Sequence, residues 1–481
     1  MTGLRQKVVS GFGWRAFAEI SSIVLQIAFT AILARLLSLA DFGLAAMCLL
    51  FIRFVRALTE VGFGAAVIQS QEITPQQVSA IFCIQLAVKC GIFALCVVGA
   101  PLAAGFFEQA SLTNLIHVVA FVVIIDGLSF PITIARKNLK FRGFSILQLS
   151  GLILGNIAGI VMALTDFGVW SLIVRLLVEH SVVALLVWPI VGWWPVRPEF
   201  RGIVPFLRFG VTMFASTAVY FFSQNIAAII IGKYIGVDIL GLYNVAYNLA
   251  IVPAQKIQSI LTTVLTPAFS IRQHEPKKMR SAVFQSWFSV GAVFIPLMIG
   301  LAAVGPIFVP LIYGAKWHLA GQLLTILSFV GLLKGFEHLF RSILIATGRP
   351  KIILFITLIE TAISVPFLFA AGQYFGIWGI LIAYLSTGIF AFLLTARSVQ
   401  NAIGGPELLA IAIARSLLAG GLMFVIVYSI PFIVEANLAV LLILEIFVGA
   451  SFYVVFRSFI LSTEERKIVK QWPIIGKYLH K

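Results

Sequence analysis

Long apolar segments alternate with short polar loops along the whole chain. Each segment holds about 20 residues or more, the length that a helix needs to span roughly 30 Å of hydrocarbon. Over such lengths only helices satisfy their backbone hydrogen bonds internally. The pattern therefore predicts an all-α polytopic membrane protein with about fourteen spans, near residues 15–36, 43–67, 79–103, 114–134, 145–164, 169–191, 206–231, 240–266, 284–304, 321–346, 352–370, 375–397, 408–430 and 437–459.

Composition agrees with this pattern. Hydrophobic residues make up 61% of the 481 residues and charged residues 11%, whereas a soluble domain carries about 25% charged residues. The mean hydropathy is +1.07. Such a chain cannot cover itself with polar surface, so its expected solvent is lipid.

The net charge of +16 follows the predicted topology. With a cytoplasmic N-terminus, most Lys and Arg residues between the spans fall on the cytoplasmic side, and the outer loops receive Arg35, Lys233 and Lys316. This asymmetry is the positive-inside pattern, and it predicts that both termini are cytoplasmic. The basic charge then serves orientation and attraction to anionic lipid headgroups. No nucleic-acid partner is expected.

Two stretches indicate an internal repeat. The sequence DFGVW at 166–170 returns as YFGIW at 374–378, and the same shift of 208 residues places Gly127 on Gly335. Nearer the N-terminus, a shift of 198 residues places the Gly-Leu pair at 43–44 on another at 241–242. The alternative is chance recurrence of Gly and Trp at membrane interfaces, where Trp is enriched. The repeat predicts two parallel six-helix lobes, an arrangement that suits alternating access.

The repeat also predicts the domain organisation. We expect an N-lobe with helices 1–6 at residues 1–191, a cytoplasmic linker at 192–204, a C-lobe with helices 7–12 at 205–400, and helices 13–14 with a basic cytoplasmic tail at 401–481. The outer loops are too short for a catalytic domain, and the chain contains no nucleotide-binding or HExxH motif. These features predict a transporter and not an enzyme, with no catalytic and no metal-binding residues.

Charged residues within the spans are the candidates for function, because each costs at least about 2.5–3.5 kcal/mol at the bilayer centre. In spans 2 and 10 they share one helical face, and basic groups outnumber acidic ones. This bias suits a substrate that carries phosphate or carboxylate, and the Arg fork matches phosphate oxygens. The candidates for a cationic substrate-binding cavity are Arg53, Arg56, Lys256, Lys334, Arg341 and Arg175.

Other interpretations of these charges stay open. Arg175 and Glu179 form an i,i+4 pair that could simply neutralise itself within the bundle. Arg341, near a predicted cytoplasmic end, could snorkel to the membrane interface. Glu60 and Asp126 are candidates for a coupling ion, either H⁺ or Na⁺, and no other cofactor is expected.

Two stretches carry a resemblance to a known family. They are LLSLADFGLAAMCLLFIRFVRALTEVGFGAAVIQ at 36–69, and ARKNLKFRGFSILQLSG at 135–151, which DFGVWSLI follows. Together they resemble polysaccharide exporters of the multidrug/oligosaccharidyl-lipid/polysaccharide (MOP) superfamily, in the branch that exports colanic-acid-like and succinoglycan-like repeat units. The middle of span 2, FIRFVRALTE, is more charged than the family pattern. Cavity residues are therefore not carried over from relatives.

The resemblance implies two six-helix lobes, a central cationic cavity and a location in the bacterial inner membrane. It also implies flipping of undecaprenyl-diphosphate-linked oligosaccharide repeat units to the periplasmic leaflet, for exopolysaccharide, capsule or lipopolysaccharide assembly. Polymerase and chain-length or export proteins of that pathway are the further partners it suggests. The alternatives are a multidrug/cation antiporter of the same superfamily, which the net basic interior disfavours, and a membrane-embedded polysaccharide polymerase, which the short outer loops disfavour.

Overall fold

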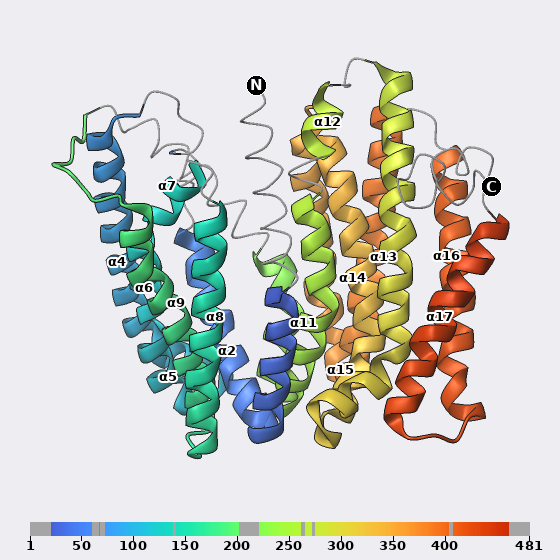
Figure 1. The fold of residues 1–481 in the computed structure, drawn as a ribbon, viewed down its shortest axis with the longest axis horizontal. Coiled ribbons are helices and arrows are strands. Elements are labelled where there is room, and N and C mark those ends of the chain that lie inside the picture. Colours follow the sequence, from blue (N-terminus) through green and yellow to red (C-terminus); the bar gives the residue numbers. More distant parts are fainter. Residues whose placement is uncertain are drawn as a thin grey trace. The chain divides into compact units, whose positions relative to one another are not determined.

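In the part of the chain that the structure describes, the regular elements are helices (Figure 1). The computed structural model describes residues 21–59, 67, 73–137, 141–201, 221–260, 265–271, 275–403 and 407–460. The chain divides into two compact units, unit 1 at Met1–Gly241 and unit 2 at Leu242–Lys481. The lobe and linker boundaries expected from the repeat stay a prediction.

Unit 1 is a bundle in which α8 packs along α9, and α4 packs along α5 and α6. Its described helices are Ser21–Leu36, α2 (Leu39–Thr59), α4 (Pro75–Phe107), α5 (Ser111–Val119), α6 (Phe121–Leu128), α7 (Pro131–Lys137), α8 (Phe141–Leu164), α9 (Trp170–Val191) and Phe221–Ile235, whose last turn is the π-helical η1 (Ile231–Ile235). The loop after α9 docks on the start of α4, where Val196 N donates to Ser79 Oγ at 3.0 Å.

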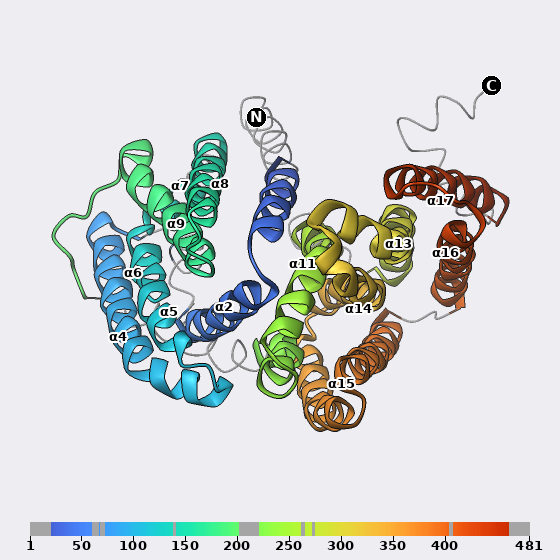
Figure 2. The same cartoon turned by 90° about the horizontal axis from the view of Figure 1, so that it is seen from below.

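Unit 2 is built around α14. Its helices are α11 (Val237–Ile260), which crosses the boundary between the units, α12 (Thr266–Ile271), α13 (Pro276–Tyr313), the short η3 (Ala315–Trp317), α14 (His318–Ala346), α15 (Pro350–Ile403), α16 (Glu407–Ile433) and α17 (Leu438–Ile460). Figure 2 shows α14 among α11, α13 and α15, whereas α16 and α17 lie against α13.

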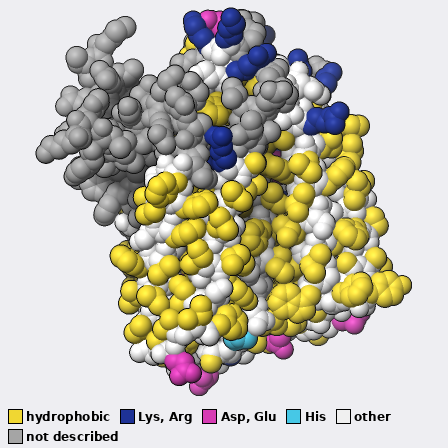
Figure 3. Space-filling model, turned by 90° about the vertical axis from the view of Figure 1, so that its right-hand side faces the viewer, with side chains coloured by type: hydrophobic (Ala, Val, Ile, Leu, Met, Phe, Trp, Pro, Cys, Tyr) yellow, Lys and Arg dark blue, Asp and Glu magenta, His cyan; other side chains and the backbone are white. Residues whose placement is uncertain are grey.

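Ten helices among the described residues are long and apolar enough to cross a membrane. On the face at the right of Figure 1, apolar side chains cover the middle, and Lys and Arg gather at one end (Figure 3). Among the exposed large apolar residues are Phe432 of α16 and Phe447 and Phe459 of α17. The protein is therefore a multi-pass membrane protein. The count of fourteen spans stays a prediction, because several expected spans run partly outside the described residues.

The span at 114–134 differs in detail from the simple pattern, whereas the spans at 352–370 and 375–397 follow it. The helix expected at 114–134 is divided into α5, α6 and α7 within one candidate span, at Ala120, whose backbone stays helical (φ −59°, ψ −27°), and just before Pro131. Proline has no N–H to continue the helical hydrogen bonds, so it favours such a break. In α15, the backbone of Gly376 leaves the helical conformation (φ 59°, ψ −143°) and separates the two spans expected at 352–370 and 375–397.

The structure repeats itself where the sequence does. Gly168 and Gly376, which the shift of 208 residues pairs, both have positive φ, 54° and 59°. A Cβ at Gly127 would lie 3.1 Å from Leu86 Cδ1, and one at Gly335 would overlap the ring of Phe294. The shift pairs Leu86 with Phe294 as well. Equivalent glycines thus allow equivalent helix contacts in the two units.

A second correspondence lies in unit 1, where the first turn of α11 packs on the first turn of α2. A Cβ at Gly43 would overlap the carbonyl oxygen of Val237, and one at Gly241 would overlap that of Leu39. The shift of 198 residues pairs Gly43 with Gly241 and Leu39 with Val237. The contact is therefore reciprocal: each glycine faces the carbonyl of the residue that the shift pairs with the other's neighbour.

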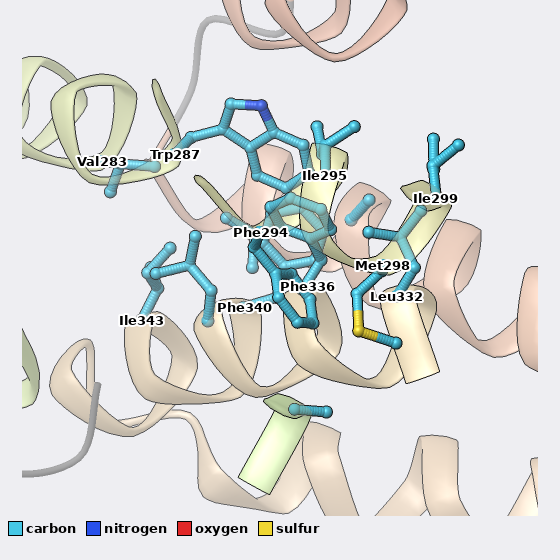
Figure 4. Packing of buried hydrophobic residues seen from close by; sticks show 14 of the residues in the cluster. Val283, Trp287, Phe294, Ile295, Met298, Ile299, Leu332, Phe336, Phe340 and Ile343 are labelled. Carbon is cyan, nitrogen blue, oxygen red and sulfur yellow. The ribbon is translucent and has the colours of Figure 1, made fainter. Parts of the chain in front are cut away.

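The core of unit 2 holds α14 in place. Trp287 of α13 stacks on Phe336 of α14 with 4.0 Å between the ring centroids, and Phe294 meets the same ring edge-on at 5.7 Å (Figure 4). Leu332 and Phe340 extend the same face of α14 and are buried in this cluster. Because this face is filled by α13, the polar residues of α14 point elsewhere.

Candidate functional site

The polar face of α14 carries Lys334, Glu337 and Arg341, at i, i+3 and i+7. Lys334 and Glu337 are buried, with 6% and 8% of their surface exposed. Gly331 allows α14 to approach α11, because a Cβ there would press on the carbonyl of Ala250. Close packing of this kind places charged side chains where water is excluded.

Arg341 is held by two partners. Its Nε and Nη2 both donate to Glu337 Oε1, at 2.8 and 2.6 Å, and Nη2 also donates to Thr357 Oγ1 of α15 at 2.9 Å. The Thr357 hydroxyl donates in turn to the carbonyl of Ile353 at 2.9 Å, which orients its lone pairs toward the guanidinium. Arg341 therefore points into the bundle in this structure, in contrast to the alternative of snorkelling.

Lys334 lies between aromatic and acidic groups. Its Nζ is 5.3 Å from the ring centroid of Tyr384 in the second half of α15, a cation–π distance. Tyr243 of α11 lies within electrostatic reach of both. Glu360 of α15 is 5% exposed and lies within electrostatic reach of Lys334, Glu337 and Arg341.

These contacts define the α14–α15 cluster: Lys334, Glu337, Arg341 and Glu360. The basic excess noted for span 10 counts residues of one helix, and the neighbouring helix adds Glu360. With all four groups ionised, the cluster is electrically balanced. Its two cations match a diphosphate in number, but two carboxylates already compete for them.

Unit 1 contains a separate ionisable pair. His180 of α9 places Nδ1 2.8 Å from Oδ1 of Asp126 in α6, and the side chains are 24% and 12% exposed. Lys89 of α4 passes beside Gly127, the neighbour of Asp126. Asp126 thus lies on α6, between α5 and α7. His180 is the partner that the sequence prediction lacked.

Arg175 is paired on its own helix. Its Nη1 lies 3.7 Å from Oε2 of Glu179, so the i,i+4 pair left open by the sequence is present. Gly155 and Gly159 of α8 pack against the backbone and Cβ atoms of these two residues. A cavity role for Arg175 stays a prediction.

The remaining candidates are more scattered. Arg53 lies exposed on α2, and Lys256 lies half-buried on α11. The side chain of Arg56 and the whole of Glu60 lie outside the described residues. The structure therefore brings together Lys334 and Arg341 of the predicted substrate-binding set.

Two buried charges in α17 were missed by the sequence prediction. Glu445 is 1% exposed, and Arg457 is 6% exposed with its guanidinium carbon 5.3 Å from the ring centroid of Phe288. The rule that singled out the other spans, a charge within an apolar window, would have found Glu445. Within the described ranges, no three His, Cys, Asp or Glu side chains gather as metal ligands would.

Comparison with known proteins gives matches in sequence and in structure. Residues 32–322 match a family described as polysaccharide biosynthesis protein. The chain is 27% identical over 401 residues to the lipopolysaccharide biosynthesis protein WzxC of Escherichia coli K12, which covers 82% of this chain and 80% of the relative.

The solved structures share the fold. The lipid II flippase MurJ has a TM-score of 0.75 at 16% identity, over 92% of this chain and 98% of its own. A multidrug resistance MATE family transporter of the MOP superfamily has a TM-score of 0.58 at 17% identity, over 80% of this chain and 98% of its own. The all-helical fold of the MOP superfamily, expected from the sequence, is therefore confirmed.

Proposed function

The chain belongs to the polysaccharide biosynthesis protein family, and on this premise we propose that it carries lipid-linked oligosaccharides across a membrane. The substrate is an undecaprenyl-diphosphate-linked repeat unit, delivered to the periplasmic leaflet of the bacterial inner membrane for exopolysaccharide, capsule or lipopolysaccharide assembly. Family membership supports this proposal, together with the shared fold of a lipid II flippase. The protein acts as a transporter and not as an enzyme.

The observation that carries the proposal is that the buried Lys334 and the partly buried Arg341, whose side chain is 17% exposed, share one face of α14. A diphosphate and several sugars lose their water when they enter hydrocarbon, which is prohibitive without replacement partners. A guanidinium fork and an ammonium group supply such partners for phosphate oxygens. The lipid tail stays in the bilayer throughout.

Alternating access supplies the movement. Two copies of one helical repeat can expose a site to each side of the membrane in turn. The coupling ion is H⁺ or Na⁺, and Asp126 with His180 is the coupling site that we propose within the described residues. A polymerase or an export protein of the same pathway would receive the flipped unit.

Mass spectrometry of lipid-linked oligosaccharides in cells depleted of the protein tests this function. We expect complete undecaprenyl-diphosphate repeat units to accumulate on the cytoplasmic face and surface polymer to be lost. A Lys334→Gln, Arg341→Gln variant should fail to restore polymer. The exposed Lys351, on the first turn of α15, provides the matched control, and Lys351→Gln should restore it.

Other outcomes would identify another function. Loss of polymer without accumulation of complete units would indicate a role in synthesis, as for the polymerase alternative. No change in polymer, with increased sensitivity to cationic drugs, would indicate the multidrug/cation antiporter, whose fold this chain shares.

A further inference from the structure

We propose that the α14–α15 cluster takes up protons at Glu337 and Glu360 when it binds an anionic diphosphate, so that the anion and the protons occupy the site together. This inference rests on the proposed function and adds to it the protonation state in which the substrate is bound. It follows from the balance of charges around Lys334 and from the geometry of Arg341.

In the present conformation the charges of Lys334 and Arg341 are already balanced by the two carboxylates of the cluster. Arg341 donates two hydrogen bonds to Glu337 Oε1, and Lys334 and Arg341 both lie within electrostatic reach of Glu360. A diphosphate that entered this site would add two negative charges to two buried carboxylates. Like charges in a buried site repel strongly, because little water is present to screen them.

Proton uptake removes this repulsion with the least movement. The Glu337 side chain is 10% exposed, and Glu360 is 5% exposed, so neither carboxylate can turn into bulk water without rearrangement of the helices. A protonated Glu337 no longer binds the guanidinium as an anion, and the fork of Arg341 becomes available to phosphate oxygens. When Glu360 is protonated, it no longer offsets the positive charge of Lys334, which can then interact with the diphosphate.

The neighbours of the two carboxylates define the charges that act on them. On α14 they are Lys334, His338 and Arg341. On α15 and α11, Tyr384 and Tyr243 lie near Lys334, and Tyr247 stacks on Tyr243. His338 stands next to Glu337 in the chain and interacts with it electrostatically, so it is a further group that can exchange the proton.

The step involves proton transfer alone. Each proton moves from water to a carboxylate oxygen when the anion binds and returns to water when the anion leaves. No bond of the lipid-linked substrate forms or breaks, and no oxidant or reductant is needed. A substrate that crosses with its protons moves less net charge across the membrane, which reduces the work done against the membrane potential.

Binding measurements at several pH values test the inference. The probe is a short isoprenyl diphosphate esterified to one hexose, whose diphosphate diester stays ionised at all pH values used. Calorimetric titration of the full-length protein in nanodiscs, repeated in buffers of different ionisation enthalpy, counts the protons taken up. We expect at least one proton to be taken up per bound probe. For each proton taken up, the Kd should rise about tenfold when the pH is raised by one unit.

Variants locate the protons. Glu360→Gln should bind the probe more tightly at high pH and should reduce the number of protons taken up, and Glu337→Gln should do the same. Glu445→Gln removes a buried carboxylate of α17 instead and should leave the proton count unchanged. Because the wild-type proton count needs no variant, a poorly folded variant does not prevent the test.

The results separate this inference from the proposed function. Binding that depends on Lys334 but has no pH dependence and no proton uptake would leave the function standing and overturn the inference. Proton uptake that is lost in Asp126→Asn but kept in both glutamate variants would also overturn it. The absence of probe binding at every pH, in a protein that folds, would overturn both.

Discussion

At the scale of single residues, Asp126 and Lys334 occupy equivalent places in the two repeats, because the shift of 208 residues pairs them. Each lies next to a paired glycine, Gly127 or Gly335. Each also contacts the sixth predicted span of its repeat. Asp126 pairs with His180 of α9, and Lys334 lies over the ring of Tyr384 in the second half of α15. One position of the repeat thus holds an acid in unit 1 and a base in unit 2.

The contact between Glu108 and Lys233 belongs to the same scale, at the predicted outer ends of the helices. Lys233 Nζ lies 2.6 Å from Glu108 Oε1 and 5.6 Å from the ring centroid of Phe106. The hydrogen bond from Lys233, and then its charge, lower the pKa of Glu108 below its ordinary value of 4.5. This ion pair links η1 to the C-terminal end of α4.

A Glu108→Gln variant should lose this pair, with an effect that depends on pH. Because the pKa is lowered on folding, the pair stabilises the native state above pH 4.5, and the contribution disappears as pH falls through the lower, folded-state pKa. Thermal unfolding in detergent should give a slightly lower Tm for the variant at pH 7, and the difference should shrink as the pH falls below 4.5. The effect is small because Glu108 is exposed. A constant difference in Tm at all pH values would contradict the ion pair.

At the scale of helices, small residues decide how closely two helices approach. Gly335 lets α14 lie against Phe294 of α13, which is 1% exposed. The ring of Phe294 is fixed by Phe336, so it cannot easily give way to an added methyl group.

Gly335→Ala should therefore destabilise unit 2 by about 1–3 kcal/mol, the usual cost of overpacking a core. Gly421 of α16 is the matched control, because a Cβ there would meet no atom within 4 Å. Gly421→Ala should be neutral or slightly stabilising, since Ala is the better helix former by about 1 kcal/mol. Denaturant or thermal unfolding of both variants measures the difference. Equal stability of the two would show that α13 and α14 do not pack this closely.

Much of the helical pattern could be predicted from the sequence, because apolar length alone identifies a span. The division before Pro131 is predictable too, because proline interrupts helical hydrogen bonds. The end of α5 at Ala120 is not, since the apolar residues continue through it. The proximity of Glu360 to Lys334 could not be predicted either. Spacing along one helix says nothing of its register against the next helix, and here the packing of Phe336 and its neighbours sets that register.

At the scale of the whole molecule, the repeat and the family were predictable for the same reason. Both are recognised from similar residues at fixed spacings, which can be read without knowing how the helices pack. The resemblance drawn from 36–69 and 135–151 is confirmed by the family match over residues 32–322. Glycines paired by the shift of 208 residues share a positive φ, and glycines paired by the shift of 198 residues make reciprocal contacts. A tandem copy of one six-helix pattern therefore explains why Gly168 and Gly376, in two distant stretches that each contain Gly and Trp, both have positive φ.

The orientation of the molecule is the last prediction, and unit 2 offers a clean test. Lys351 is exposed at the start of α15, and Glu435 is exposed in the loop between α16 and α17. α15 contains two spans and returns to the end where it began, whereas α16 then runs to the opposite end. The positive-inside pattern places Lys351 in the cytoplasm and Glu435 outside.

Single-cysteine variants in spheroplasts distinguish the two ends. The four native cysteines, Cys48, Cys83, Cys90 and Cys96, are first replaced. A membrane-impermeant maleimide should then label the Glu435→Cys variant in intact spheroplasts and the Lys351→Cys variant after permeabilisation. The reverse order would invert the topology and place the basic ends of the helices in the periplasm, against the potential that holds positive charge inside. Equal labelling of both variants without permeabilisation would contradict three spans between them, and with it the division of α15 at Gly376.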